Sequence, residues 1–136
     1  NLIGDDIDDV PAWLARPDVL VHLYGKAEAR PGRGRSWIRT RCPLVDGESD
    51  PPVAGFLKLV DTANGLVVRE DPRSVFFPNV DLTVHFIREP EAGWVGFDTR
   101  VGFGPTGLGE TSSVLSDIHG PVGTAAQSLT VRMDKR

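Results

Sequence analysis

The sequence predicts an α+β domain in which an antiparallel sheet covers a single helix. Two observations carry this prediction. Apolar residues recur at helical spacing only between Pro51 and Leu66, and they alternate with polar residues in the segments on either side. At 136 residues the chain has the length of one domain. A helix framed by runs of alternating residues favours α+β over a parallel α/β arrangement.

The predicted helix runs from about Pro51 to Leu66. Proline near its start and Gly65 near its end match the usual asymmetry of helix termini. Its apolar residues are spaced so that they fall on one stripe of the helix surface, and they are Val53, Phe56, Leu57, Val60 and Ala63.

The remaining elements are predicted strands. Two precede the helix and are joined by a turn that contains Pro31 and two glycines. Those after the helix include a pair connected by the tight hairpin Asp117-Ile-His-Gly120. The predicted strand ranges are 19–30, 36–41, 80–88, 93–103, 110–117 and 121–133.

Residues 1–17 are predicted to be a linker or N-terminal extension, and residues 18–133 the folded module. The first ten residues contain four acids and no base, and prolines follow at positions 11 and 17. We therefore expect this chain to be a fragment or processed product of a longer one.

Composition restricts the classes of function. Fifteen basic and nineteen acidic residues give a net charge of −4, which argues against a nucleic-acid partner. The single cysteine, Cys42, cannot form an internal disulfide or a cysteine-built zinc site. No apolar run reaches the ~18 residues that cross a membrane. We expect a cytoplasmic protein that uses no cofactor and no metal.

Two apparent motifs are excluded on physical grounds. Residues Gly102–Gly107 match the dinucleotide-binding pattern by letter, but Pro105 interrupts them and a strand-like segment follows, so a hairpin loop is predicted. Asp81 and His85 lie four strand residues apart, roughly 13 Å. That separation excludes a local acid–imidazole dyad.

The first predicted hairpin is rich in arginine. Guanidinium groups match phosphate bidentately, so the hairpin could hold a phosphorylated ligand. The other interpretation is a solvated hairpin with no ligand, and the sequence leaves both open. The arginines are Arg30, Arg33, Arg35, Arg39 and Arg41.

Asp81 and Gln127 are the candidate catalytic residues. Asp81 heads a strand after the apolar segment 76–80, which we expect to desolvate the carboxylate and raise its pKa toward that of a base. Gln127 lies on the last strand among small residues that leave space for a ligand. An amide there can orient a water molecule without adding charge.

The order of these elements resembles a hotdog fold. The segments that carry the likeness are Val80-Asp-Leu-Thr-Val-His-Phe86, Trp94, the hairpin at 117–120, and Gln127-Ser-Leu-Thr-Val-Arg132. More narrowly, residues 36–132 resemble the C-terminal half of the double-hotdog acyl-CoA thioesterases of the thioesterase II type. The likeness is best from Asn79 onward.

The resemblance implies hydrolysis of a fatty acyl-CoA thioester to free acid and CoA. Asp81 would act as general base on a water molecule that Gln127 positions, and backbone N–H groups at a helix N-terminus would stabilise the oxyanion. The family's third site residue, a hydroxyl, aligns with Val101–Gly102, where this sequence has none.

The resemblance also implies a partner, either a second hotdog module fused upstream or a second copy of this one. The alternative is a non-catalytic hotdog module that binds an acyl ligand or serves assembly. A hotdog hydratase is a third interpretation, but it needs an Asp and a His poised together.

Overall fold

The computed structural model describes residues 21–27, 32–67, 69–70 and 73–133, and its main element is a curved antiparallel sheet. Six strands hydrogen-bond in the order β1-β2-β5-β6-β7-β4. Their bounds are β1 Val21–Ala27, β2 Arg33–Thr40, β4 Thr83–Phe86, β5 Val95–Phe103, β6 Leu108–Asp117 and β7 Gly120–Thr130.

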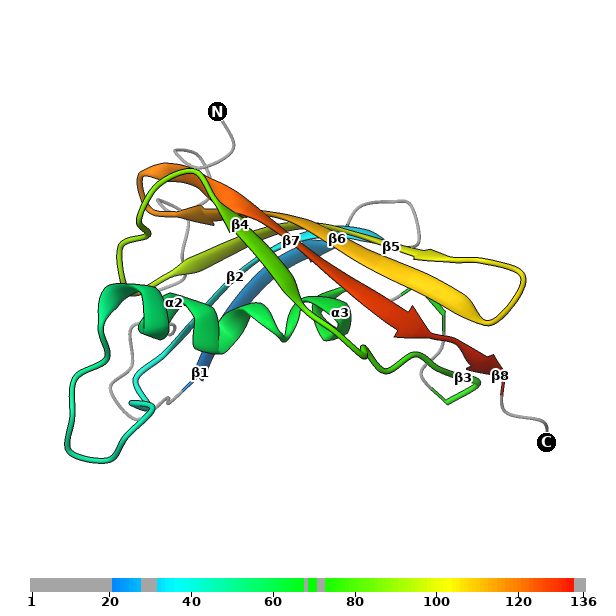
Figure 1. Ribbon diagram of the computed structural model, residues 1–136, viewed down its shortest axis with the longest axis horizontal. Helices are drawn as coiled ribbons and strands as arrows, with labels where there is room; N and C mark the ends of the chain where they lie inside the picture. Colours follow the sequence, from blue (N-terminus) through cyan, green and yellow to red (C-terminus); the bar gives the residue numbers. More distant parts are fainter. Residues whose placement is uncertain (1–20, 28–31, 68, 71–72, 134–136) are drawn as a thin grey trace.

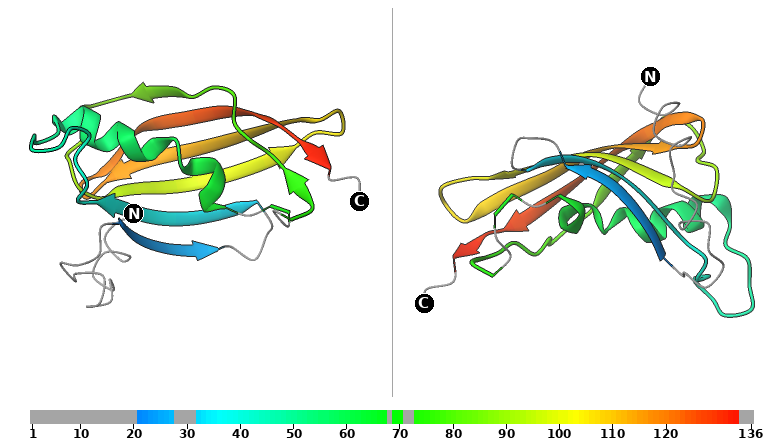
Figure 2. Two further views of the ribbon diagram at one scale, coloured as in Figure 1. Left: turned by 90° about the horizontal axis from the view of Figure 1, so that it is seen from below. Right: turned by 180° about the vertical axis from the view of Figure 1, so that it is seen from behind.

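The helical segment lies across the concave face of this sheet (Figures 1 and 2). Helix α2, Pro52–Val60, buries Phe56, Leu59 and Val60 against the strands, as its apolar stripe predicts. A second short helix, α3, follows at Ala63–Leu66. In the described part of the chain, no helix is long and apolar enough to cross a membrane.

The prediction of one continuous helix is wrong at Asp61 and Thr62. In an unbroken helix the N–H of Gly65 would donate to the carbonyl of Asp61. It donates instead to the carbonyl of Thr62, at 3.0 Å. The Thr62 hydroxyl also donates to the Leu59 carbonyl, at 2.6 Å, which competes with the helical ladder. This break leaves the Asp61 carbonyl free for another donor.

The six predicted strands correspond in order to β1, β2, β4, β5, β6 and β7, with changes at their ends. The strand predicted at 80–88 is regular only over Thr83–Phe86, and the last predicted strand divides into β7 and the two-residue β8, Arg132–Met133. Strand β8 pairs with the unpredicted β3, Val75–Phe76. The predicted linker at 1–17 lies outside the described residues.

Hairpins connect β5 to β6 and β6 to β7. The first contains the glycine-rich segment 102–107, which confirms a loop rather than a dinucleotide site. In the second, Asp117 pairs with Gly120, whose φ of 127° favours glycine. A β-bulge follows at once, because Leu115 pairs with Gly123 while Ser116 pairs with Pro121, which leaves Val122 without a partner on β6.

A polar band crosses the concave face between two apolar clusters. The larger cluster gathers around Phe56, Phe97 and Leu115, and the smaller consists of Val67, Val101 and Leu129. Between them lie side chains that are polar and no more than 3% exposed. These residues, which we call the polar band, are Thr99, Thr111, Ser113 and Gln127.

Candidate active site

Gln127 lies on β7 with its side chain facing the helices. Its neighbours along the same face, Ala125 and Leu129, belong to the two apolar clusters, and Gln127 itself is 1% exposed. Its amide nitrogen Nε2 donates to the backbone carbonyl of Asp61 at 3.2 Å and to Asp61 Oδ1 at 3.1 Å. Its amide oxygen Oε1 is buried and accepts no hydrogen bond from the described residues.

Asp61 connects the helix end to two further polar side chains. The nitrogen Nδ2 of Asn79 donates to Asp61 Oδ1 at 2.8 Å, and Asn64 reaches the oxygen of Asn79 at 3.5 Å. The carboxylate therefore receives hydrogen bonds from two amides, while the side chain of Asp61 remains exposed. This arrangement holds Gln127 at a point where the core opens to solvent.

Asp81 lies just before the edge strand β4 and is exposed. Its carboxylate accepts two hydrogen bonds from Ser128, from the backbone N–H at 2.6 Å and from the hydroxyl at 2.9 Å. These bonds, the backbone one first, lower the pKa of Asp81 below its ordinary value. The expectation that burial raises the pKa of this carboxyl is wrong.

The structure does not bring Asp81 and Gln127 into direct contact. Gln127 and Ser128 are successive residues of β7, so their side chains point to opposite faces of the sheet. Gln127 is buried under the helices, and Ser128, which holds Asp81, is exposed. The two predicted catalytic residues are therefore joined only through one strand, and their shared role stays a prediction.

Thr111 is a residue of this region that the sequence analysis did not select. It lies on β6 directly opposite Gln127, and on its other side it pairs with Val101, where the resemblance places a hydroxyl. Thr111 is 1% exposed, and its hydroxyl oxygen makes no hydrogen bond with the described residues. By contrast, the neighbouring hydroxyls of Thr99 and Ser113 bond each other at 2.8 Å.

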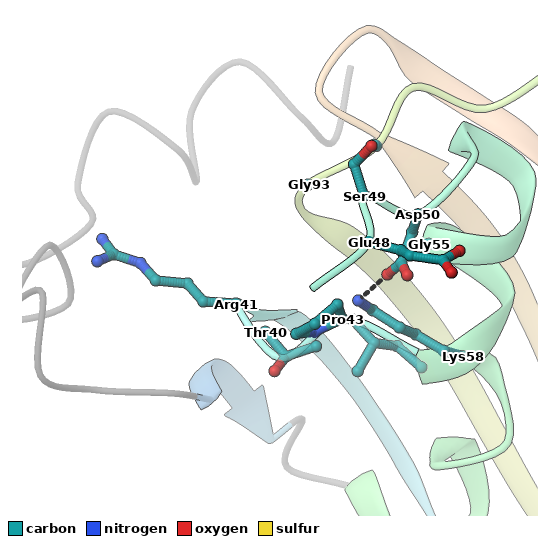
Figure 3. Close-up of a pocket in the computed structure, with 11 residues that line it drawn as sticks. Thr40, Arg41, Pro43, Glu48, Ser49, Asp50, Gly55, Lys58 and Gly93 are labelled. Atoms are coloured by element: carbon teal, nitrogen blue, oxygen red, sulfur yellow. Dashed lines mark hydrogen bonds and ion pairs between the residues drawn. The ribbon is translucent and has the colours of Figure 1, made fainter. Parts of the chain in front are cut away.

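A separate cavity of about 360 Å³ lies between α2 and the loop that precedes it (Figure 3). The loop after β2 closes over it, because Lys58 donates to the Cys42 carbonyl at 2.7 Å and pairs with Asp50. The Lys58 hydrogen bond lowers the pKa of Asp50. In Figure 3 the side chain of Arg41 points away from the other lining residues. These contacts anchor the loop after β2 to helix α2, and the packing of this loop against the helix accounts for the cavity.

The described arginines of the first hairpin are partly engaged within the sheet. Arg35 pairs with Asp98 at 3.4 Å, and the guanidinium of Arg39 lies 4.6 Å from the centre of the Trp94 ring. Arg30 lies outside the described residues. Among the residues that are described, no group of three or more His, Cys, Asp or Glu side chains is placed to hold a metal ion.

Residues 3–131 match the acyl-CoA thioesterase C-terminal domain family. The chain belongs to this family.

Solved structures show the same fold. Acyl-CoA thioesterase II TesB2 from Mycobacterium marinum has a TM-score of 0.62 and 20% identity, over 93% of this chain and 56% of that one. A Streptococcus mutans protein solved with acetyl-CoA bound has a TM-score of 0.58 and 13% identity, over 85% and 92%. A Pseudomonas aeruginosa thioesterase has a TM-score of 0.58 and 14% identity, over 82% and 81%. The chain has a hotdog-like α+β fold and spans little more than half of the Mycobacterium marinum protein.

One further match is short. The N5-carboxyaminoimidazole ribonucleotide synthase of Brucella melitensis biotype 1 is 64% identical over 33 residues, which are 24% of this chain and 9% of that protein. So small a part of either chain carries no argument about the reaction.

Proposed function

We propose that this chain is the C-terminal module of an enzyme that hydrolyses fatty acyl-CoA thioesters. Membership of the thioesterase family supports the reaction class. The observation that carries the proposal is Gln127, which holds a buried and unpaired amide oxygen on the face that the helices cover. An uncharged acceptor in that position can bind and orient a water molecule for attack on a carbonyl.

The reaction needs a carboxylate to take a proton from that water. The resemblance assigns this role to Asp81. The contacts of Gln127 indicate a second candidate for this base, Asp61, because its Oδ1 lies 3.1 Å from the amide nitrogen. Asp81 carries a lowered pKa, which weakens it as a base, and contacts Ser128 instead. Asp81 and Asp61 are therefore both candidates for the base.

The proposal includes a second hotdog module. Strand β4 forms one edge of the sheet, and exposed apolar side chains lie along and beside it, with Val80 65% and Ile87 77% exposed. Such an edge is suited to pairing with another strand. The module would be fused upstream or would be a second copy of this chain.

A second module would also supply the oxyanion donors that α2 cannot provide at Gln127. Helix α2 has nine residues and therefore rises about 13 Å, with Asp61 following its C-terminal end. The free N–H groups of its first turn lie at the far end from Gln127. Oxyanion donors for a carbonyl at Gln127 would therefore come from the helix of the partner module.

The alternative function is acyl-ligand binding or assembly without catalysis. The observation that favours it is the contact between Asp81 and Ser128, which ties the segment before β4 to β7 and has a structural explanation.

The test measures thiol release from a series of acyl-CoAs by the full-length protein. Replacement of the base by Asp81→Asn or Asp61→Asn should lower kcat by about 10²-fold or more. The matched control is Glu110→Gln, which removes an exposed carboxylate of β6. Absence of release at every chain length would favour the binding module.

A further inference from the structure

Arg33 and Arg100 lie directly opposite each other on the outer face of the sheet. They are partners on β2 and β5, and Arg100 falls between Thr99 and Val101, whose side chains are buried. Successive strand residues point to opposite faces, so both arginines lie on the face away from the helices (Figure 2). Directly opposed side chains start about 5 Å apart at Cβ, and like charges there destabilise a sheet. These two arginines therefore need an explanation.

The adjacent pair on the same two strands shows how the sheet balances such a charge. There Arg35 is opposite Asp98, and its Nε lies 3.4 Å from Asp98 Oδ2. By contrast, Arg33 and Arg100 form no hydrogen bond, ion pair or ring contact with the described residues. Glu110, one step beyond Arg100 on this face, forms no ion pair with it. Two positive charges therefore remain uncompensated in the described part of the chain.

Ser112 extends this pair onto a third strand. It is the partner of Arg100 on β6, so it lies on the same outer face, where it is exposed. A cavity of about 310 Å³ opens at this point, a volume at the small end of the range for small-molecule sites. The cavity is lined by Arg33, Asp98, Thr99, Arg100, Ser112 and Val114.

The donors around this cavity fit a phosphoryl group. Each guanidinium offers several N–H donors in a rigid fork and stays protonated, and the serine hydroxyl can donate one more hydrogen bond. Phosphate oxygens accept such charge-assisted hydrogen bonds bidentately. A phosphate monoester carries nearly two negative charges at neutral pH, so it neutralises both arginines, whereas one carboxylate neutralises only one.

We propose that Arg33, Arg100 and Ser112 bind the phosphoryl group of a small phosphorylated ligand on the outer face of the sheet. This site is separate from Gln127, whose side chain is buried on the opposite face and contacts Asp61 at the helix end. The sheet lies between the two, so the ligand occupies a second site. The proposal therefore stands whether or not the protein hydrolyses thioesters. Free phosphate and the phosphate of a nucleotide share this chemistry.

The binding experiment titrates the full-length protein with inorganic phosphate, pyrophosphate and ADP in a calorimeter, at constant ionic strength. Arg33→Gln and Arg100→Gln should each weaken binding about tenfold or more, because each removes charge-assisted hydrogen bonds. Arg132→Gln, which removes an exposed arginine of β8, is the charge-matched control and should leave binding unchanged. Tighter binding of ADP than of pyrophosphate identifies a nucleotide ligand, and equal or weaker binding identifies inorganic phosphate.

Two results of the titration would overturn the proposal. The first is a folded protein that binds none of the three probes. The second is equal weakening by Arg132→Gln and Arg100→Gln, because binding would then follow the net charge of the protein and not this site.

Unfolding in urea gives a measurement independent of the titration. In chloride without phosphate, Arg100→Gln should raise the midpoint of unfolding, because the repulsion between the two arginines is relieved. Added phosphate should raise the midpoint of the wild type more than that of the variant, since a ligand that binds only the folded state stabilises it. A lowered midpoint of the variant in chloride, or equal rises with phosphate, would contradict the proposed site.

Discussion

Arg88 and Asp117 are 29 residues apart in the chain, and the guanidinium of Arg88 donates to both carboxylate oxygens of Asp117, at 2.8 and 2.6 Å. Asp117 also accepts from the backbone N–H groups of Glu91 and His119, both at 2.9 Å. It therefore ties the β6–β7 hairpin to the segment that follows the edge strand β4.

Breaking this ion pair should destabilise the fold. Asp117 is 1% exposed, so Arg88→Ala leaves a buried charge without its partner, and we expect a loss of about 3 kcal/mol in the free energy of unfolding. The matched control is Asp98→Asn, which removes an exposed Arg–Asp pair and should cost less than about 1 kcal/mol. Urea unfolding measures both, and equal losses would contradict the prediction.

The ionisation of Asp117 makes the free energy of unfolding depend on pH. Burial raises the pKa of Asp117, but the hydrogen bonds from Arg88 and from two backbone N–H groups outweigh it and bring the pKa to about 2. Because the folded pKa is depressed, the stabilisation is complete above the unfolded pKa of about 4 and disappears as pH falls toward 2. In Asp117→Asn, unfolding free energy measured between pH 5 and 2 should fall less steeply than in the wild type.

Gly123 should not tolerate a side chain. A Cβ at this position would lie 2.0 Å from the backbone carbonyl oxygen of His85, so Gly123→Ala must push β4 away from β7. We expect a loss of about 1–3 kcal/mol in unfolding free energy. Gly102→Ala is the control, since nothing lies within 4 Å of its added Cβ. Thermal unfolding measures both variants. Equal melting temperatures would contradict the prediction, because they would show that β4 shifts without loss of stability.

The edge of the sheet predicts a mutation that acts on assembly. Ile87 is 77% exposed directly after β4, and Ile87→Lys places a charge where the second module is proposed to pair. Sedimentation of the isolated module should show weakened self-association. Its free energy of unfolding in urea should stay within about 0.5 kcal/mol of the wild type. Val114→Lys, on an exposed residue of β6, is the matched control.

The periodicity of apolar residues was enough to predict the fold class and most elements. The stripe through Phe56 and Val60 places α2 correctly because burial of that stripe drives its packing. Alternation likewise predicts β5, β6 and β7 as strands, whereas the burial of Gln127 is a finding of the structure. What periodicity cannot show is β3, whose two residues are too few to display a period.

The partners of Gln127 could not be predicted, for two local reasons. Continued from the tight hairpin without a bulge, the register would put Glu110 opposite Gln127, whereas the bulge at Val122 shifts the register to Thr111. The apolar stripe through Ala63 also predicts an unbroken helix, in which the Asp61 carbonyl would be occupied. Only the long-range contacts show that it accepts from Gln127.

The interruption between α2 and α3 has a consequence for engineering this chain. Substitutions chosen to improve helix propensity at Thr62 would favour a continuous ladder, in which the Gly65 N–H would claim the Asp61 carbonyl. Gln127 would then lose one of its two acceptors and be held only by Asp61 Oδ1. Variants selected for thermostability at this junction should therefore have a higher melting temperature and a lower rate in the proposed hydrolysis. This trade-off arises at one peptide group.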